Sequence, residues 1–348
     1  MPHNQTPADL GFRMPAEWQP HAATWMAWPH DDEQWIGMLE PVRQEFTALV
    51  RAIASDETVD LLVADEESAS DASARLGGSA VRLHLVPHQD LWLRDSGPIF
   101  VARGAEVALV DWDFNGWGNK YPAGLDDEIP THVAGLLGGV SLFHPGLVME
   151  GGSLEVDGAG LAMTTRQCLL SPERNPGVSE ATLEAALGRF LGISRVIWLD
   201  NGLEGDHTDG HIDTLTRFAN ATTIVTSVCR DTSDPNHDTL AANLEVLRRA
   251  VSAGHSRFSI VELPVPTGRV EFHGERLPLT YANFYLTNLS VLVPVYGTRE
   301  DAAALEILGP LFPGRDVIGL PARALITGGG AFHCVTQQQP AGRLWRTS

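Results

Sequence analysis

The chain has 348 residues, of which 43% are hydrophobic and 20% are charged, a composition typical of a globular protein with room for one or two domains. Its net charge of −20 argues against nucleic acid or an anionic membrane as a partner and is compatible with a cationic small molecule. No apolar run is long enough to span a membrane, no secretory signal is visible, and three widely spaced cysteines indicate no disulfide framework, so a cytoplasmic location is expected.

Strand-like and helix-like segments alternate along the chain without a low-complexity linker. In chain order, the patterns predict a helix over 38–54, strands over 58–64, 81–87 and 107–114, a short helix around 127–137, a helix over 178–192, strands over 194–200 and 222–228, a helix over 238–252, strands over 258–265 and 289–297, and a helix over 299–312. Ser179 is placed to cap the helix 178–192. Strands that alternate with helices predict an α/β architecture.

Four polar, glycine-rich segments stand beside strand-like segments. They are "WLRDSGP" (92–98), "MEGGSLEVDG" (149–158), "DGHID" (209–213) and "GGGAFHC" (328–334). Their recurrence predicts a repeated unit that brings several strand ends to one centre, although direct sequence repetition is too weak to prove it. Consecutive glycines lose much backbone entropy on folding, and they are explained where another group comes very close to the backbone.

Cys334 is the candidate nucleophile. A free cysteine is usually buried and inert, and Cys168 and Cys229, each next to an apolar stretch, fit that description. Cys334 instead follows Gly328–Gly330 and precedes polar residues, which favours a reactive thiol. His333 is adjacent, but neighbours on a strand face opposite sides. We therefore expect His333 to be a packed or hydrogen-bonded histidine rather than the base for the thiol.

A thiol nucleophile needs a histidine from elsewhere in the chain. Two histidines in segment 205–218, His207 and His211, have the spacing of a helical metal pair, followed by Asp213. Gly210 and its polar neighbours favour a loop that enters a strand instead. On that strand His211 and Asp213 would face the same side, which suits one proton-transfer histidine beside one carboxylate. No further ligands complete a recognisable metal pattern, so we predict a site without metal.

Two further acids border glycines, and each has an ordinary structural explanation. Asp95 could cap a turn through its side chain, and Glu150 could simply end a strand. Together with the histidine and the cysteine, however, these carboxylates predict one site. A papain-like protease has no use for a cluster of acids, whereas a guanidinium does, because carboxylates bind its five donors bidentately and fix it for attack by a thiolate.

The four glycine-rich segments, the last extended to "GGGAFHCVTQQQP", resemble the signature segments of the agmatine deiminases within the guanidino-group-modifying (pentein) superfamily. The resemblance also covers "MPAEWQPHAATWMAWP" (14–29), "DFNGWGNKY" (113–121), "TTRQCLLSPERNPG" (164–177) and "YANFYLTNLSVLVPVYG" (281–297), and so spans nearly the whole chain. It implies a five-fold pseudosymmetric α/β propeller (the pentein fold), formed by residues 1–348 as a single catalytic domain.

The resemblance also implies roles for individual residues. Cys334 would form a covalent amidino-cysteine intermediate as ammonia leaves, and His211 would protonate the ammonia and then activate water. Asp95 and Asp213 would hold the guanidinium nitrogens, and Glu150 would orient the histidine or share that grip.

Trp92 would pack on the methylene chain of the substrate. The implied reaction converts agmatine to N-carbamoylputrescine without a metal or an organic cofactor.

His207 departs from the family pattern, in which we expect an acid at this place, so the sequence leaves recognition of the amine tail open. A bacterial-type peptidylarginine deiminase, a deiminase of another guanidine, or a catalytically silent binding propeller are the alternatives. Arg94 adjoins Asp95 and on a strand would point away from the guanidinium clamp, which leaves an arginine carboxylate without a cationic partner. We therefore expect agmatine to be preferred over arginine; homo-oligomerisation stays open.

Overall fold

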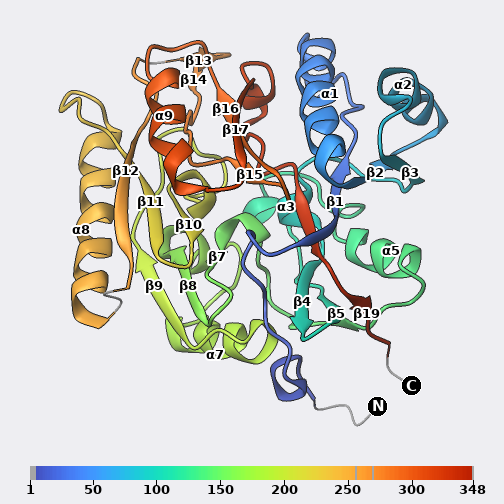
Figure 1. Cartoon of the computed structure of the whole chain (residues 1–348), viewed down its shortest axis with the longest axis horizontal. Helices are drawn as coiled ribbons and strands as arrows, with labels where there is room; N and C mark the ends of the chain where they lie inside the picture. The colour runs from blue at the N-terminus through green and yellow to red at the C-terminus, as the bar shows by residue number, and fades with distance from the viewer. Residues whose placement is uncertain (1–4, 255–256, 269, 347–348) are drawn as a thin grey trace.

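The structure is a computed structural model that describes residues 5–254, 257–268 and 270–346. Strands and helices alternate through this part of the chain (Figure 1), which confirms the predicted α/β architecture. Across the same residues, no helix combines the length and the apolar character needed to cross a membrane.

Five sheets of three or more strands recur within the described residues, and all have the same plan. In each sheet a central strand pairs antiparallel with one neighbour and parallel with another. The central strands are β1 (His21–Ala27), β5 (Glu106–Val110), β8 (Leu161–Thr165), β11 (Thr223–Val228) and β16 (Ser290–Val295). Their antiparallel neighbours are β18 (Gln337–Pro340), β4 (Ile99–Arg103), β7 (Glu155–Val156), β10 (Thr216–Asn220) and β15 (Tyr285–Leu286). Their parallel neighbours are β2 (Thr58–Val63), β6 (Leu142–Phe143), β9 (Arg195–Leu199), β12 (Ser259–Pro264) and β17 (Asp316–Pro321).

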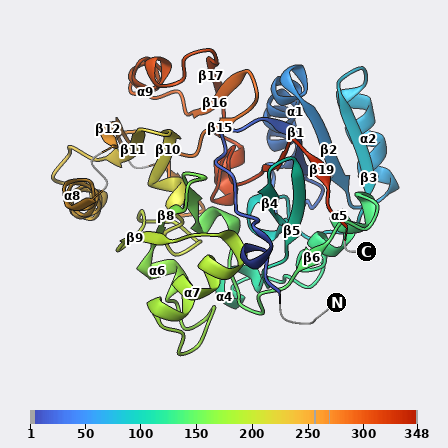
Figure 2. The same cartoon turned by 60° about the horizontal axis from the view of Figure 1, so that its bottom comes forward.

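The shared plan is the repeated unit that the sequence suggested only weakly. Figures 1 and 2 show the sheets arranged around the middle of the molecule. The short helix α3 (Leu93–Ser96) lies near this middle, as labelled in Figure 1. The first sheet joins the two ends of the chain, because the late strand β18 pairs with the early strand β1. Strands β3 (Val81–Leu85) and β19 (Arg343–Leu344) extend two of the sheets, and β13 (Glu271–Phe272) and β14 (Glu275–Arg276) form a separate hairpin.

Apart from α2, the longer helices lie where the apolar periodicity predicts them. They are α1 (Leu39–Asp56), α2 (Glu66–Leu76), α5 (Ile129–Leu136), α7 (Glu180–Leu191), α8 (Asn236–Gly254) and α9 (Asp301–Leu308). Helix α1 buries Leu39, Val42, Phe46, Leu49, Val50 and Ile53, a spacing of three and four residues that lines one face. The Ser179 hydroxyl accepts a hydrogen bond from the Thr182 N–H at 3.2 Å, which confirms the predicted cap of α7.

Each predicted strand overlaps an observed strand, but several elements lie outside the predictions. They include β1, α2, β4, β8, β17 and β18. Strand β8 shows why: all five of its residues, "LAMTT", are buried, so it lacks the apolar–polar alternation that marks a strand with one solvent face.

Candidate active site

The glycine-rich segments meet at one cavity of about 160 Å³. Of the predicted site residues, Trp92, Asp95 and Cys334 line the cavity itself. The other three, Glu150, His211 and Asp213, are completely buried. His211 and Asp213 contact Asp95 and Cys334 of the lining, respectively, and Glu150 contacts His211. We call the set Asp95, Glu150, His211, Asp213 and Cys334 the floor cluster.

The glycines are explained by contact with the side chains of the site. A Cβ on Gly152 would lie 2.6 Å from His211 Nδ1, 2.7 Å from Asp95 Oδ1 and 3.1 Å from Asp213 Oδ2. A Cβ on Gly330 would lie 2.6 Å from Trp92 Cζ3. The close approach that the sequence predicts is therefore made by residues of the protein, which pack where any larger side chain would displace them.

Asp95 lies in α3 and accepts hydrogen bonds with both carboxylate oxygens. Oδ1 accepts from the Gly152 N–H at 2.9 Å and Oδ2 from the Trp117 indole N–H at 2.9 Å. Neither bond is a cap of its own turn, so the structural explanation considered for Asp95 does not apply. Burial raises the pKa of Asp95 to about 6, with the neighbouring carboxylates Asp213 and Glu150 adding to the rise and His211 opposing it.

His211 and Asp213 are brought together, but not by a strand. His211 directly precedes a 3₁₀ turn (Ile212–Thr214), and β10 begins only at Thr216; the strand predicted to start at His211 was wrong in its first residues. Gly210 sits at a positive φ of 86° immediately before His211, a conformation that ends regular extension of the chain there.

The imidazole of His211 lies between two carboxylates. Nδ1 is 3.6 Å from Asp95 Oδ1 and Nε2 is 3.9 Å from Glu150 Oε2. Neither ring nitrogen has a hydrogen-bond partner among the described residues. Burial disfavours the charged ring, but Asp95 and then Cys168 and Glu150 outweigh it and raise the pKa of His211 well above its usual value. The resting site therefore holds an imidazolium, a proton donor.

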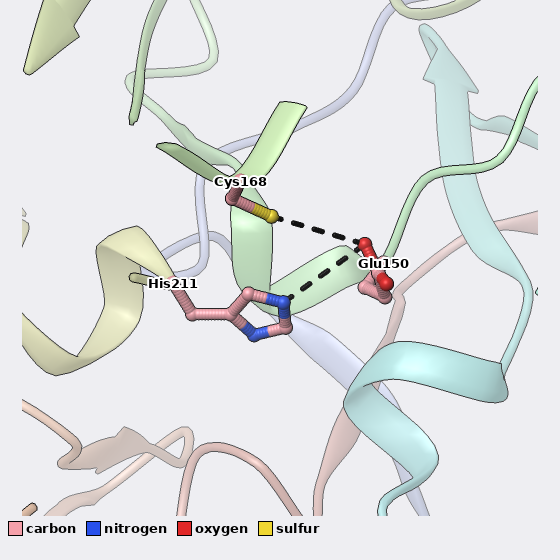
Figure 3. Close-up of side chains that lie close together, drawn as sticks. All are labelled: Glu150, Cys168 and His211. Atoms are coloured by element: carbon pink, nitrogen blue, oxygen red, sulfur yellow. Dashed lines mark hydrogen bonds and ion pairs between the residues drawn. The ribbon is translucent and has the colours of Figure 1, made fainter. Parts of the chain in front are cut away.

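Glu150 is held by Arg174. The Arg174 Nε–H donates to the two Glu150 oxygens at 2.8 and 3.0 Å, and its NH1 donates to Asp209 at 2.8 Å. Cys168 Sγ lies 4.0 Å from Glu150 Oε2 on the side of His211 (Figure 3). The pKa of the Cys168 thiol is raised by burial and by Glu150, which disfavours a reactive thiolate and is in keeping with an inert cysteine, although its place beside His211 was not predicted.

Among the described residues, two groups of buried side chains have the residue types of a metal site: Glu150, Cys168 and His211 in one, and Glu17, Glu155 and His333 in the other. In each, an arginine already occupies the carboxylates. Arg174 binds Glu150, and the Arg217 guanidinium binds both Glu17 and Glu155. A metal cation would have to displace or lie against a buried guanidinium, which the charge of these groups disfavours.

Cys334 lies in a turn and is positioned by Asn283. The Asn283 carboxamide donates from Nδ2 to Cys334 Sγ at 3.1 Å and accepts the His333 N–H at 3.1 Å. The thiol lies 3.5 Å from Asp213 Oδ2, to which it donates. Burial, followed by the charges of Asp213 and Asp95, raises the pKa of Cys334 well above its usual value. Without a bound cation the group is therefore a protonated thiol.

His333 makes hydrogen bonds with both ring nitrogens, to Asp213 and to Glu17, which confirms the expected hydrogen-bonded histidine. We expected His333 and Cys334 to face opposite sides of a strand, and this was wrong, because residues 332–335 form a turn. Arg94 is likewise helical rather than extended. Its NH1 donates to Gln337 at 2.9 Å, so its guanidinium is directed away from the cavity as expected, for a different reason.

Aromatic rings form the walls above the floor cluster. Trp92 and Trp35 pack with ring centroids 6.1 Å apart, and the Trp117 ring lies edge-on to Tyr121 at 5.7 Å. Apolar walls of this kind suit the methylene chain of a ligand whose polar groups are at its ends.

The outer part of the cavity, which we call the mouth, is lined by Gln34, Asp90, Tyr121 and His207. The Tyr121 hydroxyl is 3.0 Å from His207 Nδ1, and Glu275 Oε2 is 3.1 Å from His207 Nε2. Asp90 bonds to Gln34. Burial and the nearby Asp126 raise the pKa of Asp90 to about 7.

The sequence reasoning did not single out Glu17, Trp117, Arg174 or Asn283. Each lies inside a segment that supported the family resemblance, at 14–29, 113–121, 164–177 and 281–297. The family resemblance marked these segments but not the four residues within them. A residue that positions a catalytic side chain can be recognised only when the structure shows which side chain it contacts.

Comparison with known proteins gives a consistent result over nearly the full length. The Porphyromonas-type peptidyl-arginine deiminase family matches residues 13–340. The chain is 36% identical to the agmatine deiminase of Ectopseudomonas mendocina over 359 aligned residues that cover 97% of each protein. The structure of the agmatine deiminase of Enterococcus faecalis matches with a TM-score of 0.91 at 30% identity, covering 97% of this chain and 98% of that one. The agmatine deiminase of C. jejuni matches with a TM-score of 0.86 at 28% identity, covering 95% and 97%.

Proposed function

The chain belongs to the Porphyromonas-type peptidyl-arginine deiminase family, and on that premise we propose that it is an agmatine deiminase: it hydrolyses agmatine to N-carbamoylputrescine and ammonia. One observation carries the proposal. A thiol, a protonated imidazole and carboxylates converge on a cavity whose lining contains Asp90 and Asp95 and, among the described residues, neither lysine nor arginine. The charge of this lining favours binding of a cation.

Substrate binding starts the chemistry. The guanidinium enters with its nitrogens directed at Asp95 and Asp213, and the methylene chain packs on Trp92. The pKa of the Cys334 thiol is high in the free enzyme because of burial and the negative carboxylates around it. A bound cation opposes those charges, so binding favours loss of the thiol proton to solvent and leaves the thiolate beside the guanidinium carbon.

The reaction then has two halves. The thiolate forms a bond to the guanidinium carbon, His211 gives its proton to one terminal nitrogen, and the C–N bond breaks to release ammonia. Water next attacks the amidino-cysteine carbon while neutral His211 takes a proton from it, and the C–S bond breaks to return Cys334 and the urea product. One imidazole serves as acid and then as base, with Glu150 and Asp95 stabilising its cationic form.

Agmatine fits the charge of the cavity better than arginine does. Agmatine carries a cation at each end, and Asp95 and Asp90 line the floor and the mouth. The α-carboxylate of arginine would enter the same cavity without a cationic partner from its lining, and an unpaired buried charge costs several kcal/mol. The enzyme acts on this small substrate as a single catalytic domain in the cytoplasm, and needs no metal or organic cofactor.

Two other functions compete. A peptidylarginine deiminase is suggested by the name of the family, and a deiminase of another guanidine would use the same floor cluster. A catalytically silent binding protein would need the cavity, but binding alone does not require a thiol, an imidazole and carboxylates close together.

An ammonia-release assay with agmatine, free arginine and an arginine-containing peptide tests the proposal. We expect kcat/KM for agmatine to exceed that for arginine by at least about a hundredfold, since roughly 3 kcal/mol already gives that ratio. The Cys334→Ser variant should fold and lose turnover, whereas the matched Cys229→Ser variant should keep it. Intact-mass spectrometry of quenched enzyme should show an adduct that maps to Cys334. Equal rates with the peptide would favour the peptidylarginine alternative.

A further inference from the structure

Behind Cys334, a buried histidine joins two carboxylates that lie far apart in the sequence. His333 Nδ1 is 2.7 Å from Asp213 Oδ2, and His333 Nε2 is 2.9 Å from Glu17 Oε2. His333 is 1% exposed, Asp213 0% and Glu17 6%. Glu17 precedes the first strand and Asp213 belongs to the floor cluster, so His333 connects the N-terminal segment to the site.

The geometry requires a proton on each nitrogen of this ring. A carboxylate can only accept a hydrogen bond, and a neutral imidazole has one donor and one acceptor. With a carboxylate oxygen at each nitrogen, both bonds form only if His333 is an imidazolium. The pKa values of Glu17 and Asp213 are held below their usual values despite burial, Glu17 by Arg217 and His333 and Asp213 by His333. The two carboxyl groups are therefore ionised.

The two carboxylates that bond the ring also face other charged groups. Glu17 lies against Arg217, Arg94 and Arg315, and Glu155 shares Arg217 with it. Asp213 faces the Cys334 thiol, His211 and Arg217. The protonation of His333 therefore rests on its two hydrogen-bonded carboxylates and not on a count of charges.

The bond from His333 also fixes how Asp213 faces the site. Oδ2 of Asp213 is taken by the His333 ring and by the Cys334 thiol, whereas Oδ1 has no hydrogen-bond partner among the described residues. A carboxylate held by one oxygen presents the other to an incoming donor. Because Asp213 Oδ2 also lies 3.5 Å from Cys334 Sγ, a shift of this carboxylate would move the guanidinium relative to the attacking sulfur.

We infer that Glu17 and His333 are positioning residues for the reaction: a permanent imidazolium at His333, anchored by Glu17, holds Asp213 ionised and turned toward the guanidinium. Glu17 is itself anchored, because its Oε1 accepts the Leu286 N–H at 2.8 Å and its Oε2 binds Arg217. The role in catalysis rests on the proposed function, whereas the charge state of the ring does not.

The two nitrogens of His333 allow a matched pair of variants. In His333→Asn the amide nitrogen takes the place of Nδ1 and can still donate to Asp213, while in His333→Gln it takes the place of Nε2 and can donate only to Glu17. We expect kcat/KM for agmatine to fall about 100-fold in His333→Gln, the loss associated with a misplaced reacting group, and less than about tenfold in His333→Asn. Most of the difference should be in kcat. Equal losses in both variants, accompanied by equal losses of thermal stability, would mean a merely structural histidine and overturn the inference.

The charge of the ring is measured without substrate. Nitrogen-15 NMR of the wild-type protein should show His333, assigned by its absence in His333→Asn, with both nitrogens protonated. Glu17→Gln replaces a carboxylate, which can only accept a hydrogen bond, with an amide that can donate one to Nε2, so that nitrogen should be found without its proton. Glu155→Gln is the control, because Glu155 binds Arg217 but makes no hydrogen bond to His333; the ring should stay protonated there. A neutral ring in the wild type refutes the inference even if the enzyme deiminates agmatine, and inactivity toward every guanidine refutes the proposed function even if the ring is charged.

Discussion

Asp95, Glu150, His211 and Asp213 are at most 5% exposed at the floor of the cavity, whereas the side chains of His207 and Glu275 at the mouth are 41% and 70% exposed. The floor groups are bonded to other buried groups, such as Glu150 to Arg174. His207 and its partner Glu275 interact across solvent, where the effective dielectric constant is high. The same kinds of charge therefore act with different strength at the two ends of one cavity.

Because of this difference, the floor cluster governs the chemical reaction, whereas the mouth residues affect which substrate binds. Charges at the floor shift the pKa values of Asp95, His211 and Cys334 strongly, as a reaction through thiolate and imidazolium requires. A charge at the exposed position 207 of the mouth is screened and changes the affinity for a substrate tail by little, unlike Asp90, whose pKa burial raises to about 7. A residue such as His207 can then vary while the floor cluster stays intact, and the following predictions test that separation.

The largest effect is expected from Gly152→Ala at the floor. The new Cβ would lie within 2.7 Å of both His211 Nδ1 and Asp95 Oδ1, so these groups must move. A displacement of this kind costs about 100-fold in rate when it separates reacting groups. We expect kcat/KM for agmatine to fall by at least that factor.

Gly124→Ala is the control for Gly152→Ala, because a Cβ at Gly124 meets no atom within 4 Å. It should retain wild-type kcat/KM, measured beside thermal unfolding of both variants. If Gly152→Ala kept full activity, the packing of the floor cluster would not set its catalytic geometry.

An intermediate effect is expected from pH. Asp95 must be ionised to bind a guanidinium, and its pKa is raised to about 6, chiefly by burial. As pH falls through that value the carboxylate gains a proton and loses its charge. The kcat/KM for agmatine should therefore decrease about tenfold per pH unit below the limb, which reports groups of the free enzyme.

Trp117→Phe sharpens the pH test. The indole N–H donates to Asp95 Oδ2 at 2.9 Å and helps to lower its pKa, so its loss should move the acidic limb to higher pH by up to about one unit, the value of a hydrogen bond to a charged group. A variant at His207 should leave the limb in place. If the acidic limb shifted in the His207 variant and stayed in place in Trp117→Phe, the limb would report the ionisation of a group other than Asp95.

The sequence predicts the residues of the floor cluster better than it predicts the residues that hold them in position. Asp95, Glu150, His211 and Asp213 stand beside glycines, and a short polar segment between apolar runs is visible in the sequence itself. Arg174 and Glu17 have no such local pattern around them. Arg174 binds Glu150, which is 24 residues away in the sequence. Glu17 binds Arg217 and His333, which are 200 or more residues away. Their roles depend on a tertiary arrangement that local pattern does not encode.

The fold follows the same division. Amphipathic helices such as α1 and strands such as β2 are predicted to within a few residues, because one face of the helix is apolar or the strand is rich in branched residues. Fully buried β8 is missed. The first residues of the strand expected at His211 form a turn, which follows Asp209 and Gly210 with their positive φ values of 63° and 86°. Backbone geometry at a functional site departs most from regular patterns.

The smallest effect is expected from His207→Glu at the mouth, which introduces the acid that the family pattern suggests. An added carboxylate near the ammonium of agmatine gains at most about 1 kcal/mol when it is solvent-exposed, equivalent to roughly a fivefold rise in kcat/KM. Two neighbours limit the gain: Glu275 would become a like charge beside it, and the Lys120 ammonium, 2.7 Å from the His207 carbonyl oxygen, would compete for it. The gain should shrink as salt is added, and it should be absent for butylguanidine, which has the guanidinium and the carbon chain without the ammonium. If butylguanidine responded as strongly as agmatine, position 207 would act on the reacting end of the substrate, and the division between floor and mouth would not hold.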